Sequence, residues 1–521
     1  MRCLNSAFHS RRRFDSIPGM HHGGIATSKG SAPFVLRVIV LVTAWALALV
    51  NLYYFRVADP DFWMHVRSGA DILQSGQIRQ VDTYSFTAAG LPIINHEWLA
   101  DVLIAWTFHT GTLWLIGLKM LVGIACLLVL WRLIRLRTDD LRVTLPLFLF
   151  GAHVIGRSLL FRPQIFSYLF FAITLLVLER HRQHPTRSIW TLPLLIFVWA
   201  NVHAGFVAGL ALIGFYWLAS NLAGHDAPRR PSLSLGGVLL VAGVATLLNP
   251  YGTALWACIA RTVLDPLGRR YVQEWQPIWY DLGSWDNRLA LSLAVTAIGC
   301  LALGRGDRRD TALLLIVTLT GCGATRHLPL FTIVALPLIA TSLASPAQGW
   351  KRSTVLIAVG GLALLPVLMT ARAAVADLRP RISVVDTHYR GFPARAVEFL
   401  RRQPSSGNIW NELAWGGYVI WTLSPPWKVS LDGRNLNLYP SAVLRDHFEL
   451  FTSDAPDLSI LDHYPIDVCL FARGRQLANA LAASGRWELI YQDDKAVIFR
   501  NRASTLRLQS PAEVPGVAPA D

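Results

Sequence analysis

The chain has 521 residues, of which 53% are hydrophobic and only 16% are charged, and its mean hydropathy is +0.40. Soluble proteins carry about 25% charged residues, so this composition excludes a set of ordinary globular domains and predicts a polytopic α-helical membrane protein. The formal net charge is +15, from 48 Lys and Arg against 33 Asp and Glu. Because the sequence carries no nucleic-acid-binding module, we attribute this excess to membrane topology and expect no nucleic acid partner.

Residues 1–32 are polar and rich in arginine, which predicts a basic cytoplasmic tail. The apolar run over 33–55 is long enough to cross a bilayer of ~30 Å. It is too long for a signal peptide, and no small-residue cleavage site follows it. With ten further apolar runs we expect about eleven transmembrane helices. The later runs lie near 112–134, 142–157, 165–180, 188–201, 205–221, 233–249, 288–304, 311–325, 328–345 and 353–371.

The loops between these runs give the orientation, because short cytoplasmic loops are rich in Lys and Arg. Every second connection is basic, which places the loop 56–111 and everything after about 372 on the outer face. For a bacterial chain this predicts a multi-pass protein of the cytoplasmic (inner) membrane, with its N-terminus in the cytoplasm, a transmembrane domain over 33–372 and a first periplasmic loop over 56–111. The apolar stretch 97–110 is short and carries acidic residues, so we expect an interfacial helix there.

After 372 the sequence becomes mixed and charged, and helix-like and strand-like segments alternate. This predicts a small periplasmic α/β domain over 373–502, followed by a flexible tail over 503–521. The strands are expected at 408–411, 428–432, 467–472, 486–491 and 495–500, and the helices at 393–403, 416–423, 440–450, 456–463 and 474–484.

Polar residues on the predicted outer face mark a candidate site, because charged side chains near membrane depth are costly and usually functional. Carboxylates opposite guanidinium groups suit group transfer from a lipid-linked phosphate. A carboxylate takes the proton of the acceptor hydroxyl, and arginines stabilise the leaving phosphate. The catalytic candidates are Asp59, Asp61, His96 and Glu97, the phosphate-binding candidates are Arg157, Arg162 and Arg326, and the other pocket candidates are His65, Asn201, His203 and Glu274.

Structural roles are the alternatives for several of these residues. Asp59 and Asp61 could cap a helix that begins at Phe62. Arg162 could extend to the membrane interface, and polar side chains at helix ends could hydrogen-bond neighbouring helices. The two aspartates, two residues apart, could also share a divalent cation such as Mg²⁺ or Mn²⁺.

The predicted α/β domain has candidates of its own, at strand-to-helix transitions where such sheets bind ligands. They are Asn411, Tyr418, Asp432 and Arg434. Binding of an acceptor or a partner protein is one interpretation, and closure of a loop by the Asp432 and Arg434 pair is the other.

Several strings together resemble a family of largely uncharacterised bacterial polytopic membrane proteins, which is similar in layout to the GT-C glycosyltransferases. They are DPDFWMHVRSGADILQSGQIRQVDTYSFTAAGLPIINHEWLAD (59–101), RPQIFS (162–167), WANVHAGF (199–206), NPYG (249–252), EWQP (274–277) and WGGYVIWTLSPPWKVSLDGRNLNLYP (415–440). The resemblance implies a sugar donor on a polyprenyl-phosphate or polyprenyl-diphosphate carrier and a catalytic aspartate in the first outer loop, hence Asp59 or Asp61. It leaves a divalent metal open. Trp63-Met64 stands where the family pattern has two tryptophans.

We therefore predict a membrane glycosyltransferase of the cell envelope that transfers a sugar from a polyprenyl-phosphate donor to a hydroxyl of a glycan, lipid or protein on the periplasmic face. A lipid-linked saccharide flippase is the first alternative, but its two halves should repeat each other, and no internal repeat is visible. A non-catalytic envelope assembly protein is the second, and it predicts no outward cavity that joins the acidic loop to the arginines.

Overall fold

The structure is a computed structural model, and it describes residues 34–54, 60–222, 229–302, 307–344, 391–434 and 438–509. Two compact units make up the chain, residues 1–45 and residues 46–521. Apolar residues form the helix α1 (Phe34–Tyr54), whose first part belongs to the first unit. The catalytic candidate Asp59 and the predicted span 353–371 lie outside the described residues.

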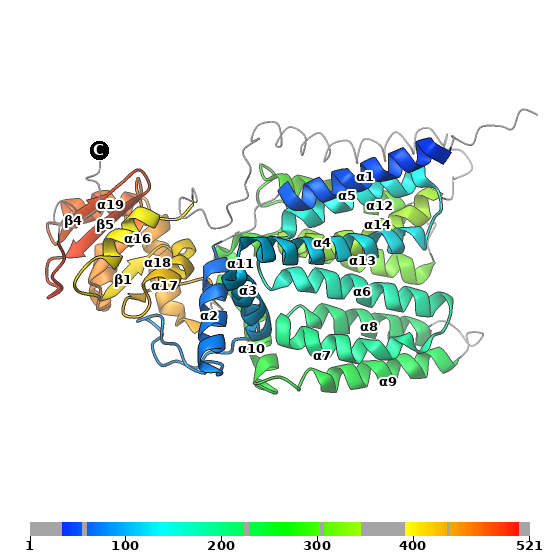
Figure 1. Cartoon of the computed structure of the whole chain (residues 1–521), viewed down its shortest axis with the longest axis horizontal. Coiled ribbons are helices and arrows are strands. Elements are labelled where there is room, and N and C mark those ends of the chain that lie inside the picture. The colour runs from blue at the N-terminus through cyan, green and yellow to red at the C-terminus, as the bar shows by residue number, and fades with distance from the viewer. Residues whose placement is uncertain are drawn as a thin grey trace, which may run out of the picture. The chain divides into compact units, whose positions relative to one another are not determined.

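Long apolar helices form the first part of the second unit and run roughly parallel in Figure 1, while α2, α3, α10 and α11 lie at one end of them. The helices of this part are α2 (Phe62–Ser75), α3 (Trp98–Thr110), α4 (Thr112–Arg135), α5 (Leu141–Ser158), α6 (Gln164–Gln183), α7 (Leu192–Val202), α8 (Phe206–Leu222), α9 (Arg229–Ala245), α10 (Ala254–Leu264), α11 (Pro266–Tyr271), α12 (Trp285–Ala302), α13 (Arg308–Gly323) and α14 (Leu328–Ala344), with short 3₁₀ turns η1 (Arg187–Thr191), η2 (Gln273–Trp275) and η3 (Thr325–His327). The bounds of α4 to α9 and of α12 to α14 agree with the predicted spans to within four residues, and a helix, α3, lies where the stretch 97–110 is expected to form one. Helices α2, α10 and α11 are not among the predicted spans.

Length and hydropathy identify two helices in the described ranges that could cross a membrane on their own. These are Thr112–Arg135 and Thr325–Ala344, and several further apolar helices have 10–17 residues. By length and hydropathy alone, two such helices are weak evidence for a membrane protein.

The C-terminal α/β region (391–434 and 438–509) is built on a mixed five-stranded sheet with the order β2-β1-β3-β5-β4. The central strand β3 is parallel to β1 and antiparallel to β5. The observed strands differ from the predicted ones by at most three residues. The elements are α16 (Ala394–Arg401), β1 (Asn408–Asn411), α17 (Leu413–Leu423), β2 (Lys428–Val429), α18 (Ser441–Thr452), η5 (Leu458–His463), β3 (Val468–Ala472), α19 (Gln476–Ala483), β4 (Trp487–Gln492) and β5 (Ala496–Asn501).

The loop between α2 and α3 joins the edge of this sheet. The N–H of Phe86 donates to the carbonyl of Val429 at 3.0 Å, and the N–H of Val429 donates to the carbonyl of Tyr84 at 3.0 Å. Ser85 pairs with Val429 in a parallel bridge. The loop therefore continues the sheet beyond the edge strand β2, so that residues more than 340 positions apart form one folded piece.

Helices α2 and α3 lie unusually close at Gly69. A Cβ atom at Gly69 would lie 2.0 Å from the carbonyl oxygen of Asp101 and 2.7 Å from the Cβ of Ala105. A side chain there would therefore push the two helices apart.

We expect Gly69→Ala to lower the free energy of unfolding by about 2 kcal/mol, as overpacking does in other cores. Thermal unfolding in detergent micelles measures the effect. Gly117→Ala is the matched control, because a Cβ at Gly117 meets nothing within 4 Å. Equal unfolding temperatures for the two variants would contradict the observed packing of α2 on α3.

Candidate active site

Four charged side chains of alternating sign form a continuous series, which we call the charge array. Nη2 of Arg162 lies 3.0 Å from Oδ2 of Asp61, and Nη1 of Arg162 lies 3.1 Å from Oε2 of Glu274. Nη1 of Arg326 lies 2.8 Å from Oε1 of Glu274. The four side chains are 17–30% exposed. Four distant parts of the sequence thus converge on a site that a ligand can reach.

Local structure explains how each residue arrives there. Asp61 directly precedes the described helix α2, yet its carboxylate makes no capping hydrogen bond to that helix and faces Arg162 instead. Arg162 stands two residues before α6, Glu274 lies in η2 and Arg326 lies in η3. The array therefore collects residues from the turns at one end of the helices.

Glu274 holds both guanidinium groups, one on each oxygen. Burial by itself raises the pKa of this carboxyl group, but the neighbouring Arg326 and Arg162 outweigh burial and lower it. The guanidinium of Arg326 also lies over the ring of Trp275, 5.2 Å from its centre, and within 3.4 Å of Oε1 of Gln164. Glu274 is therefore ionised and keeps two cations close together.

A second group surrounds Glu97, the residue before α3. Nε2 of His96 lies 3.8 Å from Oε1 of Glu97, and Nε2 of His203 lies 3.6 Å from the same oxygen. Nδ1 of His203 accepts a hydrogen bond from the N–H of Gly205 at 2.9 Å and lies 2.7 Å from Oγ of Ser167. A neutral His203 therefore carries its proton on Nε2, directed at the carboxylate.

Asn201 connects helices, as its structural alternative predicts. Its Oδ1 accepts a hydrogen bond from Nε1 of Trp98, and its Nδ2 donates to the carbonyl groups of Phe197 and Leu248. The side chain thereby ties α3 to α7 and to the end of α9.

Sequence reasoning missed Asp101, which holds His65. Oδ1 of Asp101 lies 2.7 Å from Nδ1 of His65, and Oδ2 accepts a hydrogen bond from Asn95 at 2.8 Å. The residues His65 and Asp101 are 3% and 2% exposed. They line a small cavity of about 50 Å³ together with His96 and Glu97. The signal that could have found it is an acidic residue in the first turn of the predicted apolar helix, four residues after Glu97.

Burial by itself lowers the pKa of His65, but the carboxylate of Asp101 outweighs burial, with smaller contributions from Glu97 and Asp61, and raises this pKa to about 9. His65 is thus an imidazolium at neutral pH. Burial lowers the pKa of His203, and the nearby Arg326, His96 and His65 lower it further.

Arg157 is not a member of the charge array. Its Nε lies 2.5 Å from Oδ1 of Asp286 at the start of α12, and its Nη2 lies 3.1 Å from Oδ2 of the same residue. This pairing separates Arg157 from the other two phosphate-binding candidates.

The candidates of the α/β region take part in internal contacts. Asn411 is fully buried; its Nδ2 donates to the carbonyl of Leu431, and its Oδ1 accepts from the N–H of Ser430. The ring of Tyr418 stacks on Phe392 at 5.0 Å and meets Trp63 edge-on at 5.5 Å. Asn411 thus holds the region together, whereas Tyr418 also joins it to α2 through Trp63.

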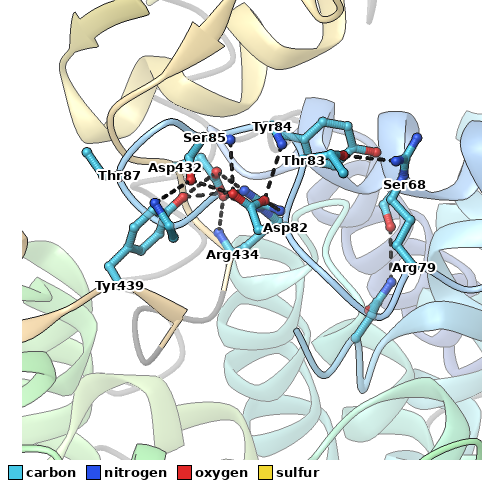
Figure 2. Close-up of polar contacts among 12 residues, drawn as sticks. Ser68, Arg79, Asp82, Thr83, Tyr84, Ser85, Thr87, Asp432, Arg434 and Tyr439 are labelled. Atoms are coloured by element: carbon cyan, nitrogen blue, oxygen red, sulfur yellow. Dashed lines mark hydrogen bonds and ion pairs between the residues drawn. The ribbon is translucent and has the colours of Figure 1, made fainter. Parts of the chain in front are cut away.

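Arg434 forms buried ion pairs with Asp432 and with Asp82 of the first loop, as Figure 2 shows. We call these three residues the lock. Nη1 of Arg434 lies 2.5 Å from Oδ1 of Asp82, and Nη2 lies 2.7 Å from Oδ2 of Asp432. Tyr439 donates from its hydroxyl to Asp432 at 2.6 Å. Burial raises the pKa of Asp432, but the guanidinium outweighs burial and lowers it. The loop-closing interpretation thus extends to Asp82, which no local pattern indicated.

Among the described residues, no group of three or more His, Cys, Asp or Glu side chains is arranged to hold a metal ion. Of the two aspartates that could share a divalent cation, Asp61 faces Arg162, and Asp59 lies outside the described residues.

An apolar groove of about 470 Å³ lies between α3, α6 and α7. Its wall includes Leu99, Phe166 and Val202, together with Leu73, Ala100, Val102, Leu103, Trp106, Phe170 and Val198. Leu99 is two residues from Glu97, Val202 directly precedes His203, and Phe166 is one helical turn after Arg162. The groove is thus lined by residues that are close in sequence to these polar groups.

Two crystal structures of ArnT from Cupriavidus metallidurans resemble the chain over most of its length. The structure bound to undecaprenyl phosphate has 15% sequence identity and a TM-score of 0.50. The apo structure has 14% identity and a TM-score of 0.51, and both alignments cover 92% of this chain and 100% of the other. ArnT is a glycosyltransferase of the GT-C fold.

The chain has a GT-C fold. This confirms the fold that the sequence resemblance implies, and the helical part is accordingly that of a polytopic membrane protein. No family model matches the sequence, and no curated protein does either. At this level of identity the likeness shows the fold alone.

The His65 pair predicts a pH-dependent stability. Because the pKa of His65 is higher in the folded protein than the ordinary value of 6.5, its contribution is complete below pH 6.5 and is lost as the pH rises through 9. A shift of this size corresponds to about 3 kcal/mol. We expect Asp101→Asn to remove this dependence from thermal unfolding curves measured between pH 6 and 10. Asp281→Asn, in an exposed turn, should keep the wild-type profile; identical profiles for all three proteins would contradict the pairing.

Proposed function

We propose that the protein is a membrane glycosyltransferase that moves a sugar from a polyprenyl-phosphate donor to a hydroxyl acceptor on the periplasmic face. One observation carries this proposal: two guanidinium groups lie together in the charge array, and Phe166, four residues after Arg162, lines an apolar groove. A lipid-linked phosphate needs both parts, an apolar surface for its isoprenoid chain and cations for its phosphate. The groove has the volume of an ordinary ligand pocket, and undecaprenyl phosphate is the ligand in the ArnT structure of the same fold.

Asp61 is the base in this proposal, with Asp59 as the other candidate from the first loop. Its carboxylate takes the proton of the acceptor hydroxyl while the acceptor oxygen forms a bond to the anomeric carbon of the sugar. The bond between that carbon and the phosphate oxygen breaks, and the phosphate keeps the electron pair. Negative charge thus passes from Asp61 to the phosphate. Arg162 lies 3.0 Å from Asp61 and is linked through Glu274 to Arg326. Its guanidinium would stabilise the negative charge on Asp61 before transfer and on the phosphate after it.

The remaining candidates surround this chemistry. His96 and Glu97 line the small cavity, and Nε2 of His203 lies 3.6 Å from Oε1 of Glu97, so these three would contact the sugar or the acceptor. The topology belongs to the proposal as well: about eleven spans in the bacterial inner membrane, a cytoplasmic N-terminus and a periplasmic α/β domain over 373–502. The acceptor is a glycan, lipid or protein hydroxyl.

We expect Asp61→Asn to lower kcat at least 100-fold, the usual contribution of a general base. Transfer of radiolabelled sugar from polyprenyl-phosphate-linked donors by the purified protein in lipid vesicles measures this. Asp281→Asn is the matched control and should retain full activity. If Asp61→Asn and Asp59→Asn both retain full activity, the assignment of the base is wrong.

Arg326→Met should raise the KM for the lipid-linked donor at least tenfold, because a charge-assisted contact to phosphate contributes about 1.5–3 kcal/mol. The KM for the acceptor should change little. Arg261→Met removes an exposed arginine from α10 and serves as the control for loss of positive charge. An equal rise of the donor KM in both variants would indicate a general electrostatic effect without a phosphate site at Arg326.

A further inference from the structure

Gly433 of the α/β region lies directly against the carboxylate of Asp61. A Cβ atom at Gly433 would lie 1.8 Å from Oδ1 and 2.8 Å from Cγ of Asp61. Gly433 is not among the described glycines with positive φ. The backbone conformation would accept another residue here, but any Cβ atom at this position would displace the carboxylate of Asp61.

A second glycine of the same region approaches the residues on either side of Asp61. A Cβ atom at Gly417 would lie 3.1 Å from the carbonyl oxygen of Pro60 and 3.2 Å from the Cβ of Met64. The contact at Gly433 is thus part of a close interface between the α/β region and the segment that begins α2.

The lock fixes the position of Gly433. Its two neighbours, Asp432 and Arg434, form the buried ion pair, and Arg434 also holds Asp82 of the first loop. The guanidinium of Arg434 further lies over the ring of Tyr84, 4.9 Å from its centre. Movement of Gly433 away from Asp61 would separate these buried charges, which is strongly unfavourable.

We propose that the α/β region completes the active site through Gly433, a positioning residue whose bare backbone keeps the Asp61 carboxylate opposite Arg162. The importance of this contact for catalysis rests on the proposed function, whereas the contact itself does not. The region is then a wall of the reaction site, in addition to any role in acceptor or partner binding.

A double-mutant cycle of Gly433→Ala and Asp61→Gly in the full-length protein tests this contact without an activity assay. Gly433→Ala should lower the unfolding temperature of the wild type by several degrees. It should leave that of Asp61→Gly nearly unchanged, because the colliding atoms are gone. Gly243→Ala is the control, since a Cβ at Gly243 meets nothing within 4 Å. An equal loss of stability in both backgrounds, or none in the wild type, would overturn the proposal.

Sugar transfer provides the second measurement. Gly433→Ala should lower kcat at least tenfold with the donor KM within about twofold of wild type, because Asp61 is displaced while Arg326 and the groove remain. Full kcat in Gly433→Ala would overturn the positioning role. If the wild type transfers no sugar from any polyprenyl-phosphate donor while the stability cycle shows the expected coupling, the proposed function fails and the contact stands.

Discussion

The burial of Arg434 between two carboxylates is the constraint on which the candidate site depends. A buried guanidinium is tolerated only when all its partners are in place, and here the partners come from the first loop, Asp82, and from the α/β region, Asp432. Main-chain hydrogen bonds between the same loop and Val429 also join the loop to the α/β region. The lock therefore joins the segment that carries Asp61 to a sheet more than 340 residues away.

From this junction the site extends across the ends of the membrane helices. Asp61 meets Arg162 before α6, and Glu274 of η2 holds Arg162 and Arg326 together. Phe166, four residues after Arg162, lines the apolar groove. The two carboxylates and two guanidinium groups of the charge array balance in formal charge. In the proposed transfer, a proton on Asp61 would leave the array with one positive charge, which would stabilise the charge that develops on the leaving phosphate.

Much of this arrangement could be predicted from local sequence patterns, because apolar runs fix the helices and alternating segments fix the strands to within a few residues. Residues of the predicted outer face, such as Asp61 and Arg326, could be recognised as charges near the predicted membrane spans. The partners did not: Asp101 lies 36 positions from His65 and Asp82 lies 352 positions from Arg434. Pairs at such separations depend on tertiary packing, as does the separation of Arg157 from the array and the need for glycine at Gly433.

Binding of the lipid carrier tests the central claim most directly. The full-length protein in detergent should bind undecaprenyl phosphate at least tenfold more tightly than undecaprenol, which has the same isoprenoid chain without the phosphate. Native mass spectrometry or microscale thermophoresis can measure both affinities. The preference should disappear in an Arg162→Met, Arg326→Met double variant that still binds undecaprenol. Equal affinity of the wild type for the two lipids, or an unchanged preference in the double variant, would contradict the account.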